Sequence, residues 1–215
     1  MTIIAGGTLE QKALLRDALL PGLDQASPVL LEVAASCLSR SLGHDLVVDG
    51  NFIQIFRILE NEDVRVRESM IKELRSHIQG SDEAARKRLV EAGILSVMLH
   101  TYTRTKDDLL NLMTTCVLPM LAPAFTQIDG GSTLFPLLTH EEPRIRAATI
   151  QALKDVIDSR HGNVEKMAKA CVIETLYPLT LTNDAVRDLW CRIILKTVDH
   201  LENRAEIDML FESLK

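Results

Sequence analysis

The sequence predicts an all-α protein built from about five stacked helical repeats. Three observations support this fold class. Residues 140–157 are a degenerate copy of residues 61–78, one apolar helical pattern recurs along the chain, and aromatic residues make up only 4% of the 215 residues. Because 47% of the residues are apolar but few are aromatic, Leu, Ile, Val and Ala must supply the core, which suits packed helices better than an aromatic-rich sheet.

One template accounts for the long helices. An apolar anchor residue is followed by apolar residues at +4, +5, +8 and +12, and this spacing places all five on one face of a helix. The clearest copies begin at Val66, Ile145 and Val186, and looser copies begin at Leu30 and Leu109. Neighbouring anchors are 36 to 43 residues apart. A template that recurs at this period indicates a repeat array.

The anchors also divide the chain. The approximate repeats are residues 1–45, 46–80, 81–125, 126–160 and 161–215. No low-complexity linker separates them, so we expect a single domain over residues 1–215 rather than two. A helix is expected over residues 9–20, where it would cap the first repeat.

Turn and capping residues lie where the template requires breaks. Gly93 divides residues 82–105 into two short helices, and residues 163–182 are their expected counterpart. The segments 49–63 and 129–143 match one another, and each opens with an Asp-Gly pair suited to a sharp turn. Acidic residues that can cap free N–H groups precede three of the long helices: Asp63, Asp107 and Asp184.

This order of elements resembles the armadillo/HEAT superfamily over nearly the whole chain. Residues 85–121 keep the armadillo order of short helix, glycine, second helix, acidic turn and long helix. A Val-Arg or Ile-Arg pair near the start of the long helix is more similar to HEAT repeats, and it contains Arg67, Arg146 and Arg187. The resemblance implies a right-handed superhelical solenoid whose long helices line a concave surface.

The resemblance also directs attention to two positions of each long helix. Armadillo proteins that bind extended peptides carry Trp at +6 and Asn at +10, whereas this chain has neither there, which argues against importin-like peptide capture. An ordinary solvated helix face and a partner-binding groove are the two interpretations of this polar face, whose basic character is strongest at Arg192 and Lys196. The candidate groove residues are Arg40, Lys72, Ser76, Gln151, Asp155, Arg192 and Lys196.

Two further features are interpreted as structural. The arginines at +1 are expected to bridge to the acidic turn of a neighbouring repeat, with recognition of a partner as the alternative. The only tryptophan, Trp190, lies on the apolar stripe at +4 of the last copy. Core packing or capping of the stack is its expected role, and an exposed partner contact is the alternative.

Patterns for catalysis and metal binding are weak. The single His-Glu dipeptide, His140-Glu141, lies in a predicted turn, and one dipeptide cannot supply a coordination sphere. The four cysteines form no CxxC motif, and each is interpreted as a small buried apolar side chain: Cys37, Cys116, Cys171 and Cys191. We therefore predict no catalytic residue, no cofactor, no metal site and no enzymatic activity.

Charge and hydropathy limit the classes of partner that the chain is expected to bind. The net charge of -6 argues against nonspecific nucleic-acid binding, and the short basic cluster Arg86–Arg88 is interpreted as one side of a charge-paired helix that also carries Glu83 and Glu91. No apolar run approaches the ~20 residues of a membrane span. The start of the chain lacks the features of a signal peptide. A cytoplasmic or nuclear protein with reduced thiols and no membrane partner is expected.

These observations predict a non-catalytic scaffold that presents a curved helical surface to a protein partner. The alternative is a self-assembling structural module, either a homodimer or part of a larger solenoid, joined through uncovered repeat ends. A helical-repeat metalloenzyme is the third and weakest interpretation.

Overall fold

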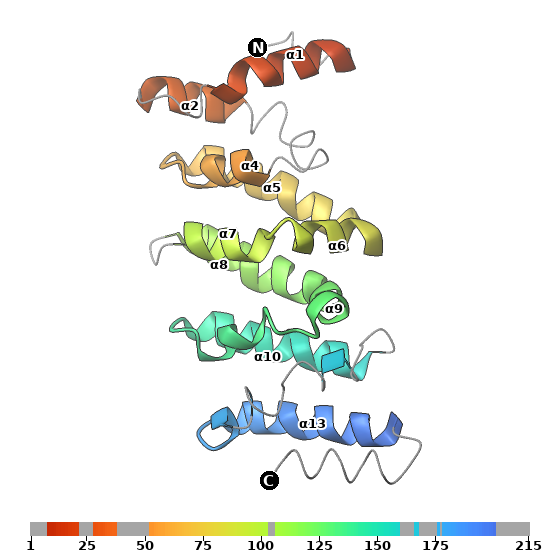
Figure 1. Cartoon of the computed structure of the whole chain (residues 1–215). Helices are drawn as coiled ribbons and strands as arrows, with labels where there is room; N and C mark the ends of the chain where they lie inside the picture. Colours follow the sequence, from red (N-terminus) through yellow and green to blue (C-terminus); the bar gives the residue numbers. More distant parts are fainter. Residues whose placement is uncertain are drawn as a thin grey trace. The chain divides into compact units, whose positions relative to one another are not determined.

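The computed structural model describes residues 8–21, 28–37, 52–102, 106–159, 166–167, 176 and 178–200. Every regular element in these ranges is a helix, and none is a strand (Figure 1). The predicted all-α class is therefore confirmed. The chain divides into two compact units, Met1–Leu112 and Met113–Lys215. The single domain and the right-handed superhelix stay predictions.

The first unit is built around the long helix α5. Its helices are α1 (Leu9–Leu19), α2 (Pro28–Cys37), α4 (Phe52–Leu59), α5 (Val64–Gly80), α6 (Glu83–Glu91), α7 (Ile94–Thr101) and α8 (Asp107–Leu112). Helix α4 packs against both α5 and α7, and α5 also packs against α8. The inward faces are apolar, and Ile55, Ile58 and Leu59 of α4 are fully buried.

Helix α5 follows the template closely. Its five template residues, Val66, Met70, Ile71, Leu74 and Ile78, are all buried. The helix begins where the sequence predicts, because the Asp63 carboxylate accepts the backbone N–H of Arg65 at 2.9 Å.

The hinge predicted at Gly93 is present. Helix α6 ends at Glu91 and α7 begins at Ile94, with Gly93 between them in the left-handed conformation at φ 78°. A residue with a Cβ atom is strained at this φ, which is the physical reason for glycine here. The predicted counterpart at 163–182 lies mostly outside the described residues.

The second unit is centred on α10. Its described helices are the π-helical turn η3 (Met113–Val117), α9 (Leu118–Asp129), the 3-10 helix η4 (Phe135–Thr139), α10 (Pro143–Asp158) and α13 (Asp184–His200). Helix α10 packs against each of the others. The template residues Ile145, Thr149, Leu153 and Ile157 of α10 are buried. Pro143 lies in the first turn of α10, where a backbone N–H has no acceptor within the helix, so its absence costs no helical hydrogen bond.

The sequence pattern did not predict the π-helical turn η3. Pro119 follows it closely and has no N–H to continue the α-helical ladder, and its ring would collide with the carbonyl of Thr115. A wider turn relieves that collision.

The stretch Asp107–Asp129 corrects one expectation. By length and composition alone it is apolar enough to cross a membrane, although no apolar run of that kind was expected. In the structure, 67% of its most apolar window is buried inside the protein, which is typical of a core helix.

The Asp-Gly-Gly turn after α9 forms as predicted. Gly130 and Gly131 adopt φ values of 70° and 87°. The Asp129 carboxylate accepts the N–H of Gly131 at 2.8 Å and that of Thr133 at 3.0 Å, and it also accepts the Thr133 hydroxyl. Residues 49 and 50, the equivalent pair, lie outside the described residues.

Candidate functional site

The residues at +6 and +10 face solvent on the long helices. In the first unit Lys72 and Ser76 of α5 are exposed. In the second unit Gln151 and Asp155 of α10 are exposed, and on α13 Lys196 is exposed while Arg192 is half-buried. Arg40 lies outside the described residues. Because the +4 and +8 residues of α5 and α10 are buried, the template correctly separated the inner face of these helices from the polar outer face.

The basic patch expected on α13 is largely neutralised. Arg192 donates from Nη1 to Asp158 at 3.1 Å and from Nε to Asp188 at 3.3 Å, so its charge is shared with two carboxylates. Lys196 makes no ion pair with another described residue. On α10, the Gln151 amide donates to Asp155 at 2.7 Å. Among the described residues, the polar face of the second unit therefore offers hydrogen-bonding groups and the Lys196 cation rather than a basic patch.

Arg192 belongs to a set of four charges between α10 and α13 that we call the charge quartet: Lys154, Asp158, Asp188 and Arg192. Lys154 Nζ lies 2.6 Å from the Asp188 carboxylate. The hydrogen bond from Lys154, together with the charges of Lys154 and Arg192, holds the pKa of Asp188 below its ordinary value. The quartet was missed at the level of sequence. The sequence pattern that indicates the quartet is a pair of opposite charges one turn apart on each helix. The positive residue comes first on one helix and the negative residue comes first on the other.

The arginines at +1 hold the turns that precede the long helices. Arg67 is 7% exposed and donates from Nη1 to the carbonyls of Asn61 and Glu62, at 2.8 and 3.0 Å. Arg146 makes the equivalent pair of bonds, to the carbonyls of His140 and Glu141 at 2.7 and 3.0 Å. These carbonyls lie in the turn just after the preceding helix, so a cation is favourable there.

Arg187 makes a related contact, donating to the carbonyl of Thr180 at 3.1 Å. The structural interpretation of the three arginines is therefore confirmed, but its geometry is corrected. Only for Arg67 does the structure show the expected bridge to the acidic turn of the next repeat, with Nε 2.9 Å from Asp108. The residue before the anchor is Asp108 in that copy but Ala185 in the copy after Arg146.

A buried lysine extends this arrangement in the first unit. Lys106 is 8% exposed, and its Nζ donates to the carbonyl of Glu60 at 3.0 Å, next to the two carbonyls held by Arg67. Lys166 does the same for α9, donating to the carbonyls of Gln127 and Ile128. Lysines far along the chain thus satisfy carbonyls at helix ends, and no local sequence pattern signals this.

The structure confirms only part of the prediction for the cysteines, and both interpretations of Trp190 stay predictions. Cys116 is buried as expected, Cys37 is half-buried, and Cys171 lies outside the described residues. Cys191 is exposed, which corrects its assignment to the core. Position +5 lies at the edge of the apolar face, since Ile150 at +5 of α10 is only half-buried. Trp190 is half-buried.

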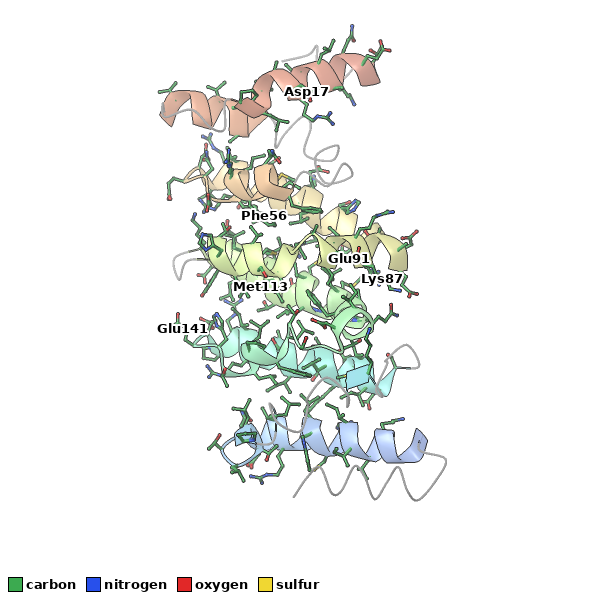
Figure 2. The ribbon with its side chains drawn as sticks, viewed as in Figure 1. Asp17, Phe56, Lys87, Glu91, Met113 and Glu141 are labelled. Carbon is green, nitrogen blue, oxygen red and sulfur yellow. The ribbon has the colours of Figure 1, made fainter. Side chains whose placement is uncertain are left out.

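The remaining polar clusters have local roles. Among the residues that the structure describes, no three His, Cys, Asp or Glu side chains are grouped so as to hold a metal ion. His140 accepts the N–H of Glu142 within the turn that contains Glu141 (Figure 2). In the basic cluster of α6, Lys87 pairs with Glu83 at 3.3 Å, as the spacing predicted.

No family model and no curated protein matches the chain. Two similar solved structures are crystal structures of engineered proteins from the Northeast Structural Genomics Consortium. The first is 20% identical with a TM-score of 0.43, and the match covers 84% of this chain and 78% of that one. The second is 20% identical with a TM-score of 0.42, and the match covers 85% of this chain and 47% of that one. The chain thus spans about half the length of the second protein.

Proposed function

We propose that the chain is a non-catalytic binding module of the armadillo/HEAT type, which holds a protein partner on the polar face of its long helices. The observation that carries the proposal is the exposure of Lys72, Ser76, Gln151, Asp155 and Lys196, all at +6 or +10, over a buried apolar face. A surface fixed on packed helices loses little conformational freedom when it binds, which favours affinity.

The chemistry of this face suits a polar partner surface. In the second unit the Gln151–Asp155 pair offers an amide and a carboxylate, and Lys196 offers an exposed cation. In the first unit Lys72 and Ser76 lie one turn apart on α5. Exposed contacts of this kind set specificity and association rate more than affinity, and they weaken as salt is added.

The test compares three charge reversals with the same change in net charge. Lys72→Glu and Lys196→Glu alter the face, while Arg88→Glu alters an exposed position of α6 that lies off the face. Arg192 is left intact because it holds Asp158 and Asp188. A partner captured by the parent chain should bind each face variant roughly tenfold more weakly, with melting temperatures unchanged. Equal binding by all three variants, or equal loss, would contradict the proposal.

A second candidate function, self-assembly, is favoured by a separate observation. Apart from Val64 of α5, the large apolar side chains that are exposed lie near the start and the end of the described sequence. They are Leu14, Val29 and Val33 in α1 and α2, and Leu181 and Leu195 in or beside α13, each between 53% and 72% exposed. Repeats bury such side chains against neighbouring repeats.

Light scattering on a sizing column, in the presence of reductant, tests this candidate. A dimer or larger species at tens of micromolar that disappears in Leu195→Glu and in Val33→Glu would support assembly through these surfaces. A monomeric parent chain at that concentration would rule it out.

A further inference from the structure

The two helices that form the charge quartet carry their charges in opposite order. On α10, Lys154 precedes Asp158 by four residues, and on α13, Asp188 precedes Arg192 by four residues. Lys154 contacts Asp188 and Asp158 contacts Arg192, so both contacts join residues 34 positions apart. The two helices therefore lie alongside one another in the same direction, in one defined register.

Apolar packing alone fixes this register weakly. The buried side chains of α10 and α13, which include Val156, Ile157, Leu189 and Ile193, gain free energy from burial in any register that covers them, because the hydrophobic effect is non-directional. The charged side chains, in contrast, favour one register, because each of them must lie beside an opposite charge. A slip of one turn either way places Lys154 beside Arg192 or Asp158 beside Asp188, and like charges repel.

No other long helix in the described part of the chain carries such a pair at these positions. The residues at +9 and +13 are Lys154 and Asp158 on α10, whereas the helix anchored at Leu109 has Leu118 and Ala122, both buried. On α5 the same positions hold Arg75 and Gln79, which are not of opposite charge.

We propose that the charge quartet locks α13 onto α10 in register, and so fixes how far Lys196 lies from Gln151 and Asp155 along the polar face of the second unit. Its four members act as positioning residues. The lock is made of partly exposed charges, with Lys154 at 21% and Asp158 at 54% side-chain exposure, so ionic strength weakens it. The inference concerns the register itself and holds whether or not that face binds a protein.

The sign pattern allows a matched set of variants. Lys154→Glu with Asp158→Lys reverses α10 alone, and Asp188→Lys with Arg192→Glu reverses α13 alone. Each double variant keeps the net charge and the opposite charges within its own helix, but it places like charges across both contacts. The quadruple variant reverses every sign and so restores every attraction.

Amide hydrogen exchange of α13 in low salt is the measurement. We expect exchange of α13 to be roughly tenfold faster in both double variants, and the quadruple variant to return to the parent rate. The difference should shrink as sodium chloride rises to about 1 M, where the Debye length falls to ~3 Å. Helix α5, in the first unit, serves as the internal control and should exchange at the parent rate throughout.

Two results would overturn the proposal. Parent rates in all variants would show that the charges do not hold α13. Fast exchange in the quadruple variant, as fast as in the doubles, would show that the individual residues matter and not their pairing. Because this readout involves no partner, a failure here is distinct from a failure of the proposed binding function.

Discussion

At the scale of the residue, the most informative side chain is Arg67. It is buried, yet it forms one ion pair through Nε and two bonds to backbone carbonyls through Nη1. A buried cation with such partners stabilises a turn only while every partner is in place. Arg146 repeats the carbonyl bonds in the second unit.

Replacement of this side chain should therefore be costly. Arg67→Met leaves Asp108 without its cation and two carbonyls without their donor, and we expect the free energy of unfolding to fall by about 2–4 kcal/mol. Urea unfolding followed by circular dichroism measures it. The control is Arg65→Met, because Arg65 is 75% exposed and its pair with Asp63 contributes about 0.5 kcal/mol or less. Equal losses in the two variants would show that burial of Arg67 is irrelevant.

Gly93 provides a second test at a single position. A Cβ atom there meets no atom within 4 Å, so Gly93→Ala creates no collision, but φ 78° is unfavourable for alanine. We expect a loss of about 1 kcal/mol from the backbone alone. Gly80→Ala, at the end of α5, also has open space and no positive φ, and it should be neutral or slightly stabilising. Thermal melts of both variants measure these changes in stability. An unchanged melting temperature in Gly93→Ala would contradict the argument that its backbone conformation is unfavourable for alanine.

At the scale of the element, the turn after α9 depends on pH. Burial disfavours the charge of Asp129, but hydrogen bonds from the Thr133 side chain and from the N–H groups of Gly131 and Thr133 outweigh it, so its pKa lies below the ordinary 3.8. The unfolded chain then binds the proton more readily than the folded one. The contribution of Asp129 is present above pH ~4 and is lost as pH falls through the lowered pKa.

Asp129→Asn tests this dependence. The variant should be less stable than the parent chain at pH 6, and the gap should narrow as pH falls below 4, where the parent carboxyl becomes protonated. Urea unfolding between pH 3 and pH 7 measures both chains. A gap that stays constant over this range would mean that the pKa of Asp129 in the folded chain is not below its ordinary value.

The elements also show how far sequence patterns reach. The template located α5, α10 and α13, and Gly93 located the α6–α7 hinge, because helical periodicity and glycine geometry are local properties. The π-helical turn η3 and the short 3-10 helix η4 were not predicted. Pro119 and Pro136 each remove an N–H, and which alternative turn then forms depends on the packing around it.

The candidate site was predicted less completely for the same reason. Exposure of Lys72, Gln151 and Lys196 followed from helical spacing. The pairing of Arg192 with Asp158 did not, because Asp158 lies 34 residues earlier in the chain and meets Arg192 only through the packing of α10 on α13. The lysines that bind helix-end carbonyls, Lys106 and Lys166, lie 38 to 46 residues from their acceptors and were missed for that reason.

At the scale of the whole molecule, each compact unit has its own buried core, so core damage should remain local. Leu74 and Leu153, both at +8, are fully buried in the first and the second unit. Truncation of either leucine to alanine should cost about 2–5 kcal/mol. In repeat proteins each repeat contacts only its neighbours, so the effect spreads a short distance.

Hydrogen exchange resolves where the loss occurs. We expect Leu74→Ala to raise exchange mainly in α4, α5 and α7, and Leu153→Ala to raise it mainly in α9, α10 and α13. An equal rise over all described helices in both variants would show that the chain unfolds as a single cooperative body.

The bonds made by Arg146 have a practical corollary for protein engineering. The carbonyls that accept these bonds lie five and six residues upstream of Arg146. Residues 140–158 therefore contain both the arginine and the turn that it stabilises, and they could be transplanted as one segment into another helical array. The equivalent segment around Arg67 could not be transplanted in the same way. Arg67 also forms an ion pair with Asp108, 41 residues further along the chain. A transplanted segment without this carboxylate would contain a buried arginine that lacks its counter-ion.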